Sequence, residues 1–207
     1  MNLETPGSYL MLESKIASIF IPAFVVTYAC LIWGGFFLFK SEKLSMKMVG
    51  FAILWVVGFL IDCFFIFSQP SGSIFMTIAI ALNLSAAALF FWTANTAKKR
   101  GLAAIFSATE PSFLILSGPY RFIRHPYYAS YILFWASAVL ASCNYIVLLP
   151  FIILSFIYLL QIRAEETKLS SSLFDKEYEE YIASTGALLP FSQSIKRIIT
   201  RIVHTLK

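Results

Sequence analysis

The sequence contains few charged residues. Only 13% of its 207 residues are Asp, Glu, Lys or Arg, whereas an average soluble domain carries about a quarter. This scarcity excludes an ordinary soluble domain, and the 59% hydrophobic content favours an integral membrane protein. The net charge of +5 does not indicate nucleic-acid binding, because the basic residues lie in short loops beside apolar runs, where they set the orientation of membrane helices.

Cysteine is also scarce. Cys30, Cys63 and Cys143 lie in or at the edge of apolar runs. Their spacing matches no metal site, and thiols at lipid depth are poor candidates for disulfides. We therefore interpret them as small apolar packing residues and expect no metal ion.

A basic leader is missing before the first apolar run. The charged residues that precede this run are Glu4, Glu13 and Lys15. The run itself, residues 16–39, is longer than the apolar core of a signal peptide. We therefore predict that it is a true membrane span.

Five apolar runs approach the roughly 20 residues that a membrane-spanning helix needs. They are residues 16–39, 48–67, 74–97, 127–141 and 145–162. The fourth run is short, and only three residues join it to the fifth, so these two should form a tight antiparallel hairpin. The predicted fold is all-α: a single domain built as a bundle of about five transmembrane helices.

Basic and neutral loops alternate along these runs. Lysines follow the first run, and five lysines and arginines lie within residues 98–124, whereas residues 68–73 and 142–144 carry no charge. The positive-inside rule then places the N-terminus outside and the C-terminus in the cytoplasm. The expected location is a bacterial inner membrane or an endomembrane, with the polar clusters described below on the cytoplasmic side.

Amphipathic sequence follows the fifth run. Residues 163–183 should continue it as a cytoplasmic amphipathic helix, which residues 186–190, GALLP, would end. Residues 194–207 carry isoleucines on one face and basic residues near the other, a pattern typical of a helix on an anionic lipid surface. We accordingly divide the domain into three N-terminal spans (16–97), a central core (112–191) and an interfacial basic helix (192–207).

Two polar clusters interrupt the apolar sequence. Residues 117–128 read SGPYRFIRHPYY, and residues 163–166 read RAEE. Charge beside a bilayer is costly and is rarely kept without a partner or a task. Pro119 and Pro126 prevent helix from running through the first cluster, which leaves irregular backbone of the kind that membrane proteins tolerate where it lines a cavity. The function should therefore be interpreted from both clusters together.

Both clusters resemble signatures of a known superfamily. Residues 114–128, LILSGPYRFIRHPYY, look like the first signature of the isoprenylcysteine carboxyl methyltransferases and phospholipid methyltransferases. Residues 165–190, with EETKL, FDKEYEEY and LP in order, look like the second. The resemblance implies an integral membrane enzyme that uses S-adenosylmethionine to methylate a lipophilic or small acceptor at the cytoplasmic face.

The resemblance also implies roles for individual residues. The cofactor-binding residues would be Phe113, Leu114, Ile115, Tyr120, Arg124, His125, Pro126, Tyr127, Tyr128 and Glu165. Arg163 and Glu166 are the candidate catalytic residues. Carboxyl methyltransferases of the family carry an arginine one turn before the acidic pair, whereas this chain has Gln161 there, and its nearest arginine is Arg163. This difference weakens the case for a carboxylate acceptor.

The residue types suit this chemistry. S-adenosylmethionine carries a sulfonium cation, an amino-acid head and an adenine ring, so its site needs acceptors for the cations, donors for the carboxylate and aromatic walls. His125 and Arg124 can donate, Glu165 or Glu166 can accept, and the tyrosines can line the pocket. Methyl transfer is a direct displacement that needs alignment and exclusion of water.

Several alternatives stay open at this stage. Sterol reductases carry a similar Arg-His-Pro motif and bind NADPH, although they usually have more spans, and the chain could also be a non-enzymatic membrane scaffold. The acceptor could be a prenylated cysteine carboxylate, a phospholipid amine, a small thiol or another lipophilic metabolite, and an amine would need Glu166 or His125 as a base. Asp62 is either functional or part of an interhelical hydrogen bond, and Asn83 suits helix packing.

Overall fold

The chain is described by a computed structural model over residues 6–38, 46–99, 114–170 and 175–190. Within these ranges it is helical and contains no strand beyond an isolated bridge between Ile123 and Gly186, so the all-α prediction is confirmed. The helices are α1 (Pro6–Leu38), α2 (Met46–Ser68), α3 (Ser73–Lys99), the 3-10 turn η2 (Gly118–Arg121), α4 (Pro126–Ser142), α5 (Leu148–Ser170) and α6 (Asp175–Ser184).

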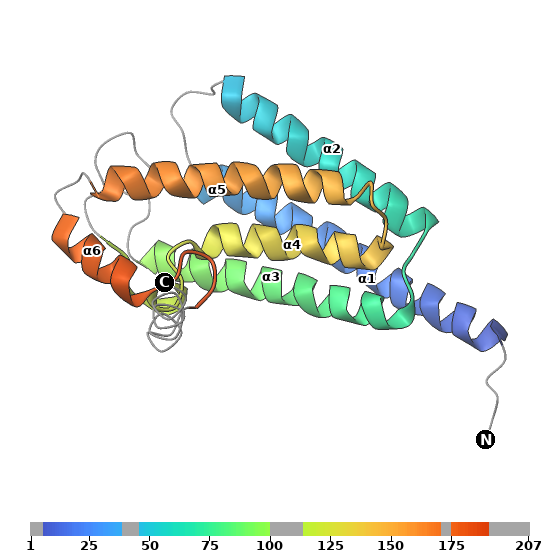
Figure 1. Ribbon diagram of the computed structural model, residues 1–207. Helices are drawn as coiled ribbons and strands as arrows, with labels where there is room; N and C mark the ends of the chain where they lie inside the picture. The colour runs from blue at the N-terminus through green and yellow to red at the C-terminus, as the bar shows by residue number, and fades with distance from the viewer. Residues whose placement is uncertain (1–5, 39–45, 100–113, 171–174, 191–207) are drawn as a thin grey trace, which may run out of the picture.

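The helices form an elongated bundle in which α4 lies between α3 and α5 (Figure 1). In the described part of the chain, four helices are long and apolar enough to cross a membrane: Lys15–Gly34, Met48–Ser68, Ser73–Lys98 and Leu148–Ser170. The fourth predicted run corresponds to α4, which has 17 residues, most of them buried. The protein is therefore a multi-pass membrane protein, and the other helices enclose the short helix α4.

Local sequence explains where α4 begins and ends. Pro126 occupies its first turn, where the missing N–H of proline has no intrahelical partner to lose. Cys143 ends the helix in the left-handed conformation, with φ of 49°, and its N–H bonds to the carbonyl of Val139. Cys30 and Cys63 are half-buried, whereas Cys143 is exposed, so the interpretation as a packing residue does not fit Cys143.

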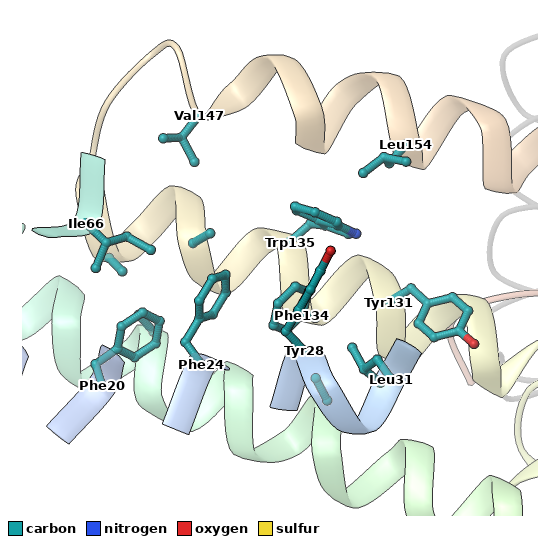
Figure 2. Close-up of a cluster of buried hydrophobic side chains, with 14 of the residues drawn as sticks. Phe20, Phe24, Tyr28, Leu31, Ile66, Tyr131, Phe134, Trp135, Val147 and Leu154 are labelled. Atoms are coloured by element: carbon teal, nitrogen blue, oxygen red, sulfur yellow. The ribbon is translucent and has the colours of Figure 1, made fainter. Parts of the chain in front are cut away.

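Aromatic side chains of α1 and α4 meet in the core (Figure 2), and Trp55 of α2 packs against them. The rings of Phe24 and Phe134 stack at 4.4 Å, and those of Trp55 and Trp135 meet edge to face at 5.4 Å. A Cβ on Gly58 would lie 3.0 Å from Pro150, so α2 and α5 approach closely there. Helices in lipid associate through such packing rather than through burial from water.

Buried polar groups in the bundle differ in how they are satisfied. Asn83 donates a hydrogen bond of 3.1 Å from α3 to Thr27 on α1, which fits the expected packing role. Asp62 on α2 is fully buried, and neither of its carboxyl oxygens has a hydrogen-bond partner among the described residues. The structure therefore does not supply the interhelical hydrogen bond that was one interpretation of Asp62.

The C-terminal part departs in one respect from the expected continuous helix. α5 extends past residue 162 to Ser170, and α6 then packs at the end of the bundle where α4 begins (Figure 1). The predicted interfacial helix over residues 194–207 lies outside the described residues.

Candidate functional site

The first polar cluster forms a compact turn against α3. Gly118 has φ of +62°, and a Cβ there would lie 2.3 Å from Oγ1 of Thr96. Only glycine satisfies both conditions without strain or overlap. The following residues form η2, which brings the chain to His125 at the start of α4.

His125 lies between the two acidic residues of α5. Its Nε2 is 3.1 Å from Oε1 of Glu166, and its Nδ1 is 3.5 Å from Oε2 of Glu165. The His125 side chain is 7% exposed. Glu165 and Glu166 are 40 and 41 positions from His125 in the sequence. They meet it at one end of the bundle because α4 and α5 are antiparallel neighbours.

Tyr128 adds a second bond to the same acidic pair. Its hydroxyl donates to Oε1 of Glu165 at 2.5 Å. His125 is the N-cap of α4 and Tyr128 lies three positions after it, so both side chains reach the acidic pair from the start of this helix. The Tyr128 ring also lies 5.7 Å from that of Tyr158 on α5, which gives this end of the site an aromatic wall.

Arg124 joins the acidic pair to the C-terminal residues. Its Nε donates to Oε1 of Glu166 at 2.9 Å, and its Nη1 donates to the carbonyls of Ile182, at 3.5 Å, and Thr185. The backbone N–H groups of Arg124 and His125 donate to the carbonyls of Gly186 and Ala187 at 2.9 and 3.0 Å. The Arg124 side chain is 10% exposed, so its guanidinium is largely enclosed by these partners.

Nearby tyrosines are held in the neutral form. Burial, with Tyr127, Tyr181 and Glu165 nearby, raises the pKa of Tyr120 well above 10. Burial and the Glu166 carboxylate raise the pKa of Tyr178 to about 12, against the opposing effect of Arg124. These hydroxyls consequently stay protonated near pH 7. No group of His, Cys, Asp or Glu in the described ranges could hold a metal ion.

The structure brings some predicted site residues together and leaves others apart. Arg124, His125, Tyr128, Glu165 and Glu166 form one hydrogen-bonded network. The remaining predicted residues that are described lie around this network or away from it. Leu114 and Ile115 are half-buried non-helical residues, Tyr120 accepts a hydrogen bond at its carbonyl from Tyr181, Pro126 and Tyr127 are buried, and Arg163 is exposed.

Two of these placements matter for the roles assigned from sequence. The ring of Tyr127 packs on Phe90 of α3 at 5.6 Å, on a different side of α4 from Tyr128. The exposed Arg163 is not part of the His125 network. Phe113 lies outside the described residues.

Sequence analysis missed the residues that hold the turn from the C-terminal side. Thr185, Gly186 and Ala187 supply carbonyls to Arg124 and His125, and Thr96 packs against Gly118. Backbone carbonyls leave no residue-type signal, so GALLP could be read only as a helix-ending segment.

Comparison with known families matches the part of the chain that carries this network. Residues 77–171 match the isoprenylcysteine carboxyl methyltransferase (ICMT) family. This part of the chain, which is less than half of its length, is similar to that family. The matched segment includes most of α3, the η2 turn, α4 and α5, and hence all five residues of the hydrogen-bonded network. A comparison with curated protein sequences found no match.

The family match and the helix composition agree on a general function. The four long apolar helices place the chain in a membrane, and the ICMT family consists of methyltransferases. The protein is accordingly assigned as a membrane methyltransferase.

Proposed function

We propose that this protein transfers a methyl group from S-adenosylmethionine to a lipophilic or small acceptor at the cytoplasmic membrane surface. The observation that carries the proposal is the meeting of His125 with Glu165 and Glu166 beside the aromatic wall of Tyr128. The side chains of Glu165 and Glu166 are 39% and 25% exposed, so they can exchange a protein partner for a ligand.

The residues present fit the chemical groups of this methyl donor. Glu165 and Glu166 can accept hydrogen bonds from its ammonium and ribose hydroxyl groups, and His125 can donate to its carboxylate. The face of the Tyr128 ring suits a cationic sulfonium. Bound there, S-adenosylmethionine would supply a methyl group activated by the positive charge on sulfur.

The protein's contribution to the reaction is binding, alignment and exclusion of water. The Gly118 turn and α4 fix the position of the His125 imidazole, which two carboxylates then orient. Holding both reactants in position lowers the activation free energy by several kcal/mol, because their translational freedom is already lost when they bind. For an amine acceptor, Glu166 Oε1 or His125 Nε2 would take up the proton that the nitrogen releases.

The cytoplasmic location rests on the basic residues at this end of the bundle. Lys98 lies in the last turn of α3, and Arg121 and Arg124 lie in or beside η2. Basic residues concentrate at cytoplasmic ends of membrane helices. The methyl donor is a charged metabolite, which would reach the site from that side, while a lipophilic acceptor would enter from the bilayer.

Titration of purified protein in detergent tests this function. S-adenosylmethionine should bind to the wild type, and His125→Ala and Glu165→Ala should each weaken binding at least tenfold, equivalent to about 1.4 kcal/mol. Arg121→Ala is the control, because Arg121 is an exposed charged residue near the site that takes no part in the His125 network, and it should leave affinity unchanged.

Two further measurements separate the alternatives. Transfer of a labelled methyl group to fractions of a lipid extract would identify the acceptor class. NADPH titration in place of S-adenosylmethionine examines the reductase alternative, which the ICMT match disfavours. A wild type that binds NADPH and not S-adenosylmethionine, or normal affinity in both site variants, would overturn the proposal.

A further inference from the structure

The C-terminal residues are bonded to the turn that precedes α4. We call α6 together with Thr185, Gly186 and Ala187 the C-terminal clamp. The hydroxyl of Tyr181 donates to the carbonyl of Tyr120 at 2.5 Å. The backbone of Gly186 and Ala187 accepts from Arg124 and His125. The clamp therefore contacts both the beginning and the end of the turn that positions the imidazole.

Arg124 is the side chain that connects this clamp to α5. Its Nη1 donates to the carbonyls of Ile182 and Thr185, at the C-terminal end of α6, where helix carbonyls lack intrahelical partners. A cation at that end also interacts favourably with the helix dipole. Its Nε simultaneously donates to Glu166 on α5. One guanidinium thus bridges two helices through different nitrogens.

The same Glu166 oxygen is bonded to Arg124 and to His125. Both Arg124 Nε and His125 Nε2 bond to Oε1, at 2.9 and 3.1 Å. Fixing this oxygen therefore fixes the imidazole as well. Its Nε is directed at Glu166 and its Nη1 at the clamp carbonyls, and the side chain is only 10% exposed. Arg124 is therefore poorly placed to contact a ligand itself.

We propose that Arg124 is a positioning residue, which holds the C-terminal clamp against the start of α4 and thereby sets His125 and Glu166 for binding the methyl donor. This inference rests on the proposed function. It makes residues 175–187, which extend beyond the family match, a required part of the site. It also replaces the role of cofactor ligand that the family resemblance implied for Arg124.

Lysine and alanine substitutions test whether the site requires the guanidinium group of Arg124 or only its positive charge. A lysine keeps the positive charge, but its single ammonium group cannot reproduce the planar arrangement of guanidinium donors. Arg124→Lys and Arg124→Ala should both weaken S-adenosylmethionine binding at least tenfold. Arg121→Ala, an exposed arginine in the same turn, should stay within twofold of wild type. Wild-type affinity in Arg124→Lys would overturn the proposal, since charge alone would then suffice.

A double-mutant cycle tests whether Arg124 acts through Glu166. Groups in one network have non-additive effects. In a Glu166→Gln background, the further loss of affinity caused by Arg124→Lys should therefore fall to threefold or less. A full tenfold additional loss would refute action through Glu166.

Hydrogen exchange in ligand-free protein provides a readout that does not depend on the methyl donor. The amides of Arg124 and His125 bond to clamp carbonyls, so peptides covering them and residues 175–187 should exchange faster in Arg124→Lys and in Tyr181→Phe. Unchanged exchange in both variants would overturn the clamp. Failure of the wild type to bind S-adenosylmethionine would instead overturn the proposed function, and the exchange result would still decide the clamp. Should Arg124→Ala not fold, these two milder variants carry the test.

Discussion

Replacing Gly118 by alanine should disrupt the turn that leads to His125, for two separable reasons. The residue has φ of +62°, a conformation that costs an L-residue about 1–2 kcal/mol. The new Cβ would also lie 2.3 Å from Oγ1 and 2.9 Å from Cγ2 of Thr96. Overpacking of this kind typically costs about 1–3 kcal/mol. The sum predicts a loss of about 2–5 kcal/mol in the free energy of unfolding, by these same estimates.

Thr96→Ala separates the two contributions. It removes Oγ1 and Cγ2 and leaves the Thr96 Cβ, which would lie 3.1 Å from the new methyl carbon. The double variant Gly118→Ala/Thr96→Ala should therefore recover most of the steric loss and retain the backbone cost of about 1–2 kcal/mol. Thr96→Ala alone should change stability little, because it removes only a local bond to the carbonyl of Trp92.

Denaturant titration of the four proteins in detergent micelles measures these free energies, and S-adenosylmethionine titration follows the effect on the site. Affinity should fall in Gly118→Ala and recover partly in the double variant. The reasoning would be refuted by a Gly118→Ala protein as stable as the wild type. It would also fail if Thr96→Ala gave no recovery, because the overlap would then not be with Thr96.

Two further predictions concern buried groups. Asp62→Leu removes a fully buried carboxyl without a hydrogen-bond partner among the described residues, so it should raise the free energy of unfolding by about 1–3 kcal/mol; a loss of stability in the same denaturant titration would show that Asp62 has a partner. Because burial raises the pKa of Tyr178 to about 12, its folded form holds the proton more tightly than the unfolded form, whose pKa is about 10. The contribution of Tyr178 to the free energy of unfolding should be fully present below pH 10 and decline as pH rises toward 12. In measurements of the free energy of unfolding against pH, Tyr178→Phe should reduce that decline.

The helical membrane architecture could be predicted almost entirely from sequence. The runs at residues 48–67 and 74–97 correspond closely to α2 and α3, because a bilayer requires long uninterrupted apolar helices. The fourth run was predicted to be short, and the corresponding helix α4 has 17 residues. The extension of α5 to Ser170 was predicted from its amphipathic continuation, whereas the separate α6 was not.

The candidate site could be predicted only in part. The proline-bounded turn and the acidic pair were identifiable because unusual residue types stand out in apolar sequence. Their pairing was a hypothesis, and the geometry of His125 with both carboxylates agrees with it. The clamp was not foreseen, because Gly186 and Ala187 act through backbone carbonyls, which every residue possesses.

The sequence by itself determined that this chain forms membrane helices, where polar chemistry interrupts them, and which methyltransferase family its central part resembles. These properties are local, because hydropathy, helix length and motif identity depend on neighbouring residues. Tertiary structure alone decided which oxygen each donor takes, why Gly118 must be glycine beside Thr96, and that Asp62 is left without a hydrogen-bond partner in the part of the chain described. Those outcomes depend on distances between helices far apart in sequence, and distances of a few tenths of an ångström separate a hydrogen bond from a clash.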